Sequence, residues 1–115
     1  MLFVCYPKCS TCQKAKAFLE MRQADYVLRD IKEDRPSLEE LRLWHSRSGL
    51  PLKKFFNTRG LQYKALALKE KLPAMSEEEQ LALLASDGML VKRPILVADE
   101  AVLVGFRQEE WEKLL

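Results

Sequence analysis

The apolar and polar positions at the N-terminal end of the chain predict a strand, a helix and a second strand. Leu2 to Cys5 is a short apolar run of the kind found in a buried strand. Ser10 and Gln13 have the spacing of a capping box, which predicts a helix that begins at about Cys9 or Ser10. Its buried face is expected to carry Cys12, Ala15, Phe18 and Leu19. Tyr26 to Arg29 is typical of a second strand, and the short connection predicts a parallel βαβ unit.

Two further capping-box patterns, each a serine followed three residues later by a glutamate, occur in the middle of the chain at Ser37–Glu40 and Ser76–Glu79. The first predicts a helix that runs to about Arg47 and ends at Gly49. The stretch 52–72 is expected to hold two short helical pieces. The second capping box predicts a helix that ends near Asp87-Gly88 and buries Leu81, Leu84 and Ala85.

The C-terminal part of the chain predicts a hairpin followed by a helix. The apolar runs Ile95-Leu96-Val97 and Val102-Leu103-Val104 are separated by a connection short enough for a hairpin turn. Gln108 to Leu115 predicts a helix whose apolar face carries Trp111, Leu114 and Leu115. The order β-α-β, an all-helical insertion over about 37–87, then β-β-α matches a thioredoxin-like fold of the α/β class. We expect a single thioredoxin-like domain over residues 1–115.

The charged residues change this picture only by excluding some partners. The 19 basic and 17 acidic residues are mixed along the chain and leave a net charge of +2. We therefore expect a mixed, solvated surface and no nucleic-acid partner held by long-range attraction. No apolar run approaches the ~20 residues that cross a bilayer, so no membrane partner is expected. The apolar N-terminus lacks a basic flank and is broken at Pro7-Lys8, which predicts a cytoplasmic protein without a signal peptide.

The cysteines supply the first candidate chemistry. Their number, three, is odd, which argues against a structural disulfide framework in a cytoplasmic chain. Cys9 and Cys12 follow a predicted strand and open a predicted helix, where unpaired N–H groups and the helix dipole stabilise an anion. With Lys8 beside it, Cys9 is expected to have a pKa below the ~8.5 of free cysteine. Cys12, one turn further on, is placed to resolve a disulfide or sulfenate on Cys9.

Other interpretations of the cysteines remain open at this point. Cys9 and Cys12 also fit a helix that they simply cap and pack. A closed zinc site needs four ligands. The further candidates are Cys5, expected to be buried in its strand, and His45, on a predicted helix with no paired ligand nearby, so no metal site is predicted. Cys5 is expected to be a small core residue rather than a third redox partner.

Arg93-Pro94, directly before the third predicted strand, is the second candidate feature. In thioredoxin-like folds the loop at this place faces the active cysteine and its proline is often cis, so we expect a cis Pro94 and an Arg93 side chain that points toward Cys9. A guanidinium suits a tetrahedral oxyanion because its planar fork donates two hydrogen bonds at once. Arg107, after the fourth strand, is a candidate for the same pocket. The alternative for both arginines is simple exposure to solvent.

Four segments of the chain, in the same order, match the pattern of a known family. They are Tyr6 to Ala15, Phe56-Asn57-Thr58, Val91 to Ile95 and Val104 to Arg107. Together they resemble the arsenate reductase (ArsC) family, and in particular its Spx/MgsR-type branch. The likeness runs across nearly the whole chain and implies a thioredoxin-like core with a helical insertion.

The resemblance also implies roles for individual residues. Cys9 would be the nucleophile that attacks arsenate, and Arg93 and Arg107 would hold the oxyanion. The family uses a third arginine; here Asn57 occupies the matching position and Arg59 lies two residues away. The resemblance implies no resident cofactor, since reducing equivalents would come from glutathione with glutaredoxin, or from thioredoxin.

The sequence therefore leaves three alternative functions open. One is an arsenate reductase-like thiol-disulfide oxidoreductase that acts on a small oxyanion through a redox-active Cys9/Cys12 pair. The alternative implied by the Spx/MgsR-type branch is a redox-sensing transcriptional regulator that binds RNA polymerase through the C-terminal domain of its α-subunit. The third is a general thiol carrier that acts on protein disulfides. Gln13 replaces a basic residue of the reductases, and Cys12 is an additional cysteine, which suits a protein that toggles its own Cys9–Cys12 disulfide.

Overall fold

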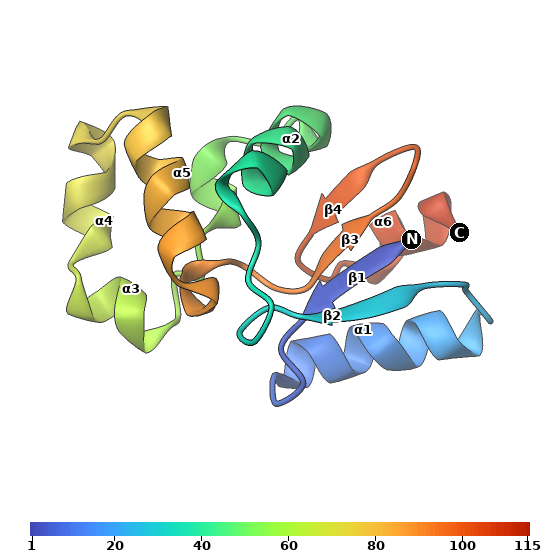
Figure 1. The fold of residues 1–115 in the computed structure, drawn as a ribbon. Helices are drawn as coiled ribbons and strands as arrows, with labels where there is room; N and C mark the ends of the chain where they lie inside the picture. The colour runs from blue at the N-terminus through green and yellow to red at the C-terminus, as the bar shows by residue number, and fades with distance from the viewer.

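The computed structural model describes residues 1–115 and is built on a four-stranded mixed sheet with strand order β2-β1-β3-β4 (Figure 1). The strands are β1 (Leu2–Cys5), β2 (Val27–Asp30), β3 (Ile95–Val97) and β4 (Val102–Val104). β1 pairs in parallel with β2 and antiparallel with β3, and β3 pairs antiparallel with β4. The predicted βαβ unit and C-terminal hairpin are thus confirmed, and the predicted thioredoxin-like α/β fold is the observed one.

Two helices cover one face of this sheet. α1 (Ser10–Met21) and α6 (Gln108–Leu114) pack on the side chains that β1 and β3 send to that face. Because successive residues of a strand point to opposite faces, Phe3 and Cys5 lie in this cluster while Val4 lies in the cluster on the other face. The ring of Trp111, from α6, is fully buried there and meets Phe3 edge to face at a centroid distance of 6.2 Å.

The ends of these two helices differ from the sequence prediction. The buried face of α1 is the predicted one, but Ser10 is the first helical residue and makes no capping box. Cys9 is the N-cap, and the Gln13 side chain donates instead to the Pro7 carbonyl at 3.2 Å. At the other end of the chain α6 stops at Leu114, and Leu115 is 39% exposed rather than part of the apolar face.

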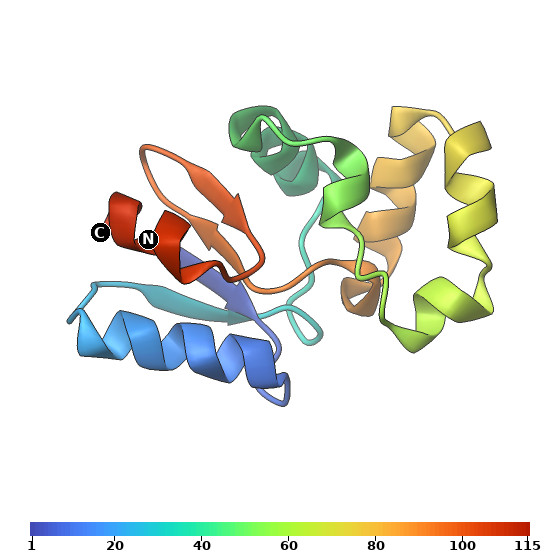
Figure 2. The ribbon, with the colours of Figure 1, turned by 180° about the vertical axis from the view of Figure 1, so that it is seen from behind.

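The helical insertion lies at one end of the sheet, away from the two termini (Figure 2). It consists of α2 (Leu38–Ser48), η1 (Leu52–Phe55), α3 (Leu61–Ala65), α4 (Leu68–Lys71), η2 (Leu72–Ala74), α5 (Glu77–Ser86) and η3 (Gly88–Leu90). Both predicted capping boxes, at Ser37 and Ser76, are present. Gly49 ends α2 in the left-handed conformation with φ 70°, which a glycine adopts without strain. Ala85, predicted as buried, is only half-buried.

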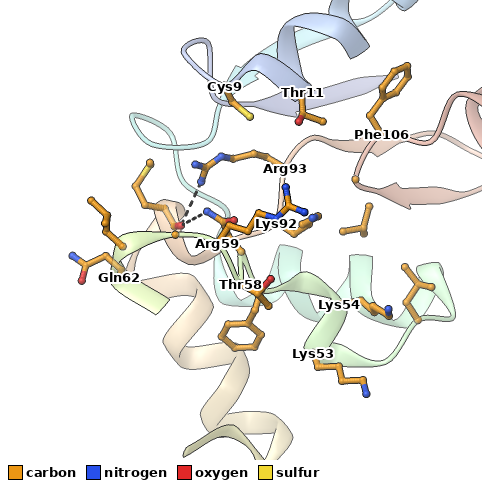
Figure 3. A pocket seen from close by; sticks show the side chains of 18 of the residues that line it. Cys9, Thr11, Lys53, Lys54, Thr58, Arg59, Gln62, Lys92, Arg93 and Phe106 are labelled. Carbon is orange, nitrogen blue, oxygen red and sulfur yellow. Dashed lines mark hydrogen bonds between the residues drawn. The ribbon is translucent and has the colours of Figure 1, made fainter. Parts of the chain in front are cut away.

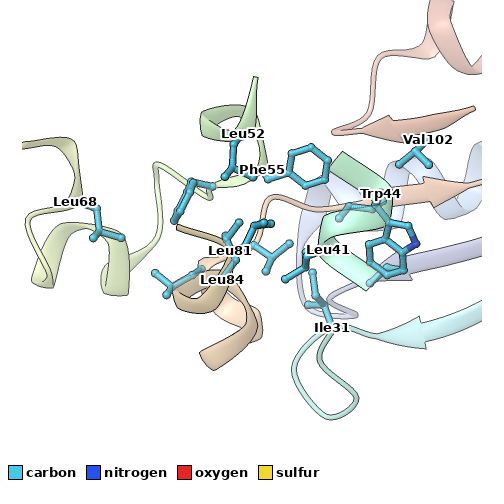
Figure 4. Packing of buried hydrophobic residues seen from close by; sticks show 14 of the residues in the cluster. Ile31, Leu41, Trp44, Leu52, Phe55, Leu68, Leu81, Leu84 and Val102 are labelled. Carbon is cyan, nitrogen blue, oxygen red and sulfur yellow. The ribbon is translucent and has the colours of Figure 1, made fainter. Parts of the chain in front are cut away.

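A continuous apolar cluster joins the insertion to the second face of the sheet (Figure 4). Val4 and Ile95 of the sheet belong to the same cluster as Leu41 and Trp44 of α2, and it extends to Leu84 of α5. Burial of such side chains contributes roughly 1.5–3 kcal/mol each, so the cluster holds the two parts in one relative position. None of the helices is long and apolar enough to cross a membrane.

A half-buried ion pair reinforces this junction. Arg29 of β2 binds both carboxylate oxygens of Glu40 in α2, at 2.5 and 2.8 Å, and its guanidinium lies 6.0 Å from the ring centroid of Trp44. Bidentate arginine–carboxylate pairs fix orientation as well as distance. The pair therefore adds a polar link between β2 and α2 to the apolar cluster.

Candidate active site

Cys9 occupies the position where the loop after β1 turns into α1. Its backbone is extended, with φ −84° and ψ 127°, and its N–H donates to the Tyr6 carbonyl at 2.9 Å, which closes a tight turn. The side chain is half-buried and packs against the α1–α6 cluster. The backbone N–H groups of Cys12 and Thr11, in the first turn of the helix, lie close enough to the Cys9 sulfur to lower its pKa. This is the anion-stabilising position that the sequence predicts for Cys9.

The surroundings of Cys9 favour its thiolate. Burial acts to raise the pKa of Cys9, but the amides of Cys12 and Thr11, the Cys12 thiol and the Arg93 guanidinium outweigh it and lower that pKa below its ordinary value. Lys8, expected to help, is exposed, and the groups that stabilise the thiolate are the amides and Arg93.

The other two thiols have the opposite tendency. Cys12 is 2% exposed, and its sulfur accepts a hydrogen bond from the Tyr6 backbone N–H at 3.3 Å. Burial nevertheless raises the pKa of Cys12 to about 12. Burial, followed by the nearby Asp30 carboxylate, raises the pKa of Cys5. All three cysteines are free thiols in the structure, and Cys9 alone has a pKa below its ordinary value.

Arg93 faces Cys9, as predicted, and the Arg93–Pro94 peptide bond is cis, also as predicted. Its guanidinium lies over the Tyr6 ring, 5.2 Å from the centroid, and Nη1 donates to the Met89 carbonyl at 3.4 Å. Figure 3 shows this side chain reaching from the loop before β3 into the space below Cys9. These contacts hold a positive charge beside the thiol and leave further guanidinium donors for an anion.

Arg107 is less closely engaged than predicted. It lines the same cleft as Cys9, but its side chain is 78% exposed and it pairs with Glu110 at 3.7 Å. Arg59 also lines the cleft, on the side of the insertion, so the structure places three arginines around one space. Asn57 donates weakly from Nδ2 to the Met89 carbonyl at 3.5 Å.

The cleft beside Cys9 has a volume of about 1100 Å³ and lies between the sheet and the helical insertion. Six cationic side chains and one carboxylate, Glu110, line it; the cations are Lys53, Lys54, Arg59, Lys92, Arg93 and Arg107. Their charges give the cleft +5, and since the whole chain carries +2, the rest of the molecule carries −3. Charges that are mixed along the sequence are thus partly segregated in space, while the 13 basic and 16 acidic residues outside the cleft remain mixed. A concave cationic surface attracts anions.

The sequence did not identify the lysines of this cleft. Lys53 and Lys54 belong to η1, nearly forty residues before Lys92, and only the packing of the insertion on the sheet brings them to one cleft. The one available signal was Lys92, which stands next to Arg93 in the segment that carries the family resemblance.

The residues considered as metal ligands do not form a cluster. No group of three or more histidine, cysteine, aspartate or glutamate side chains is placed to hold a metal ion. The His45 ring packs edge to face on Phe55 at a centroid distance of 5.8 Å. His45 is therefore part of the packing of the insertion.

The chain matches a known family over nearly its whole length. The family model described as "ArsC family" matches residues 5–114. The chain is similar to the regulatory protein MgsR of Bacillus subtilis, with 31% identity over 99% of this chain and 89% of MgsR. It superposes on an ArsC family related protein from Bacteroides fragilis with a TM-score of 0.97 and 59% identity, covering 99% and 96% of the two chains. An arsenate reductase from Vibrio cholerae is similar at 28% identity and a TM-score of 0.85, with 100% and 98% covered.

The match of the family model over nearly the whole chain agrees with the fold and with the position of Cys9 at the start of α1. The chain belongs to the ArsC family.

Proposed function

We propose that this protein is a thiol-dependent reductase in which the Cys9 thiolate attacks a small oxyanion of the arsenate type and Cys12 resolves the adduct. The observation that carries the proposal is the asymmetry of the thiols. The first-turn amides and Arg93 stabilise the Cys9 sulfur as an anion, whereas burial keeps Cys12 protonated at neutral pH. An accessible nucleophile followed by a shielded second thiol supports two-step thiol chemistry.

The proposed reaction begins at the Cys9 sulfur and ends with a Cys9–Cys12 disulfide. The Cys9 thiolate displaces a hydroxide from arsenic(V), and a sulfur–arsenic bond forms. Cys12 then loses its proton and attacks the Cys9 sulfur, which forms the Cys9–Cys12 disulfide. The electron pair of the broken sulfur–arsenic bond stays on arsenic and reduces it to arsenic(III). Glutathione with glutaredoxin, or thioredoxin, supplies the two electrons that restore the dithiol.

The cationic cleft supports the choice of an anionic substrate. Arg93 is the residue best placed to bind it, because its guanidinium already lies beside the Cys9 sulfur. Arg107 and Arg59 line the same cleft and would add longer-range attraction. A volume of about 1100 Å³ exceeds what a small oxyanion fills, and it leaves room for a segment of the reducing partner.

Arsenate-dependent oxidation of NADPH, coupled to a glutaredoxin or a thioredoxin system, tests this function. We expect turnover that Cys9→Ser abolishes. We expect Cys12→Ser to lose turnover with thioredoxin, because no internal thiol then resolves the adduct, and to keep part of it with glutathione and glutaredoxin. Wild-type turnover no higher than that of Cys9→Ser would refute the proposal.

The similarity to MgsR favours a second candidate, a redox-sensing regulator that uses the same pair of thiols. In this case the oxidation state of Cys9 and Cys12 would alter binding to the C-terminal domain of the RNA polymerase α-subunit. A pull-down on that domain with the oxidised and the reduced protein tests it. The absence of binding in both states would exclude this candidate.

A further inference from the structure

Cys5, which the sequence assigns to the core, lies in contact with the proposed redox pair. It is 2% exposed and belongs to the same buried cluster as Cys12, and Cys9 packs against that cluster. The Tyr6 backbone nitrogen, 3.3 Å from the Cys12 sulfur, is bonded directly to the carbonyl carbon of Cys5. The Cys12 sulfur therefore lies beside the last peptide of β1.

The three sulfurs form a series with Cys12 in the middle. Cys5 and Cys12 lie in one buried cluster against which Cys9 packs, and the Cys12 side chain is close enough to both neighbours to lower the pKa of Cys5 and that of Cys9. A thiol that exchanges with a disulfide must approach one of its two sulfurs. Cys5 meets this condition for the Cys12 sulfur of a Cys9–Cys12 disulfide.

We propose that Cys5 is a third redox cysteine, which takes over Cys12 from the Cys9–Cys12 disulfide and returns Cys9 as a free thiolate. This inference rests on the proposed function only in requiring that the Cys9–Cys12 disulfide forms. It adds a buried end state, the Cys5–Cys12 disulfide, and a nucleophile that is ready for a second attack.

The exchange conserves atoms and electrons. Cys5 loses its proton to solvent, and its thiolate attacks the Cys12 sulfur. The Cys5–Cys12 bond forms as the Cys9–Cys12 bond breaks, and the electron pair of the broken bond remains on the Cys9 sulfur. No external oxidant or reductant takes part, because the disulfide only moves from one cysteine to another.

The environments of the thiols set the direction and the order of this exchange. Cys9 is the best leaving group of the three, because a thiol of low pKa leaves fastest and the first-turn amides and Arg93 stabilise its thiolate. Cys5 is a slow nucleophile, because burial raises its pKa. The Cys9–Cys12 disulfide should therefore form first, and the Cys5–Cys12 disulfide should follow at a rate that increases with pH.

The chain's own tryptic sites make the two disulfides easy to distinguish. Trypsin cleaves after Lys8 and Lys14, which separates Cys5 from a peptide that holds both Cys9 and Cys12. A Cys9–Cys12 disulfide lowers the mass of that single peptide, whereas a Cys5–Cys12 disulfide joins two peptides. Fragmentation of the joined pair shows whether Cys9 or Cys12 carries the bond.

The test is a time course with the intact protein and one equivalent of diamide, a two-electron thiol oxidant. Samples are quenched with acid, alkylated and mapped by mass spectrometry. We expect the Cys9–Cys12 peptide to appear first and then to decline as the joined pair accumulates with an alkylated Cys9. Cys5→Ser and Cys5→Ala, both checked by thermal melting, should lose the joined pair and retain the Cys9–Cys12 disulfide.

The outcomes separate this inference from the proposed function. A Cys9–Cys12 disulfide that forms and persists in the wild-type protein would overturn the inference and leave the proposed function standing. A protein that never forms the Cys9–Cys12 disulfide would overturn both. A joined pair in which Cys9 rather than Cys12 is bonded to Cys5 would also overturn the proposed exchange.

Discussion

Glu40→Gln tests how strongly the Arg29–Glu40 pair fastens the helical insertion to the sheet. Besides binding Arg29, Glu40 accepts a hydrogen bond from the Ser37 backbone N–H at 3.0 Å in the capping box of α2. Glutamine is equally suited to a capping box. The substitution therefore removes the charge of the pair and the hydrogen bond that Oε2 accepts from Arg29, and it keeps the cap and the side-chain volume.

The magnitude follows from the pKa of Glu40. Hydrogen bonds from Arg29 lower that pKa to about 2, from the ~4.3 of a free glutamate. At ~1.36 kcal/mol per pKa unit, a fully shielded pair would contribute about 3 kcal/mol. The two side chains are 15% and 35% exposed, so water screens part of the attraction. We expect Glu40→Gln to lower the free energy of unfolding by about 1–2 kcal/mol at pH 7.

The loss of stability caused by Glu40→Gln should depend on pH. Because folding lowers the pKa of Glu40, the stabilisation is present above ~4.3 and is lost as the pH falls toward about 2. The difference in the free energy of unfolding between wild type and variant should therefore be full at pH 7. It should fall to about half at pH 3.

Urea denaturation followed by tryptophan fluorescence at pH 7 and pH 3 measures this difference. Glu78→Gln is the matched control, because Glu78 pairs with Arg42 in a contact whose side chains are 69% and 48% exposed. The control should change stability by less than ~0.5 kcal/mol. A loss in Glu40→Gln as large at pH 3 as at pH 7 would show that the ion pair is not its cause.

Three further predictions concern the site and the core. Cys9 should react with iodoacetamide at a lower pH than Cys5, as mass-spectrometric rates against pH would show; equal rates would contradict the role of the helix start. Arg93→Ala should weaken binding of sulfate or arsenate by about 1–3 kcal/mol, measured by calorimetry. Arg107→Ala, at an exposed position, should weaken it by less than about 1 kcal/mol. Unchanged affinity in Arg93→Ala would mean that Arg93 does not face the anion. Trp111→Ala should lower the free energy of unfolding by about 3–5 kcal/mol, because it leaves a cavity beneath the sheet. If urea denaturation shows that this free energy falls by less than about 1 kcal/mol, the result would contradict the burial of Trp111.

The sequence by itself determined the local structure of this protein. The serine–glutamate pairs at Ser37 and Ser76 predicted two helix starts correctly, since a capping box depends only on residues within one turn. The short apolar runs predicted the strands, and the spacing in α1 predicted its buried face. Cys9 at a helix start and Arg93 before β3 followed from the order of these elements.

Tertiary packing determined which residues from different elements lie close together and which are exposed. Only the docking of the insertion gathers Lys53 and Lys54 with Arg93 into one cationic cleft, because charge segregation depends on which surfaces meet. Arg107 follows β4 as the sequence order predicts, but the sequence left open whether its side chain enters the pocket or solvent, and the packing leaves it mostly exposed. The contact between Cys5 and Cys12 likewise arises because the end of β1 and the first turn of α1 are packed against each other. Interactions between residues distant in sequence depend on this packing, which no local pattern encodes.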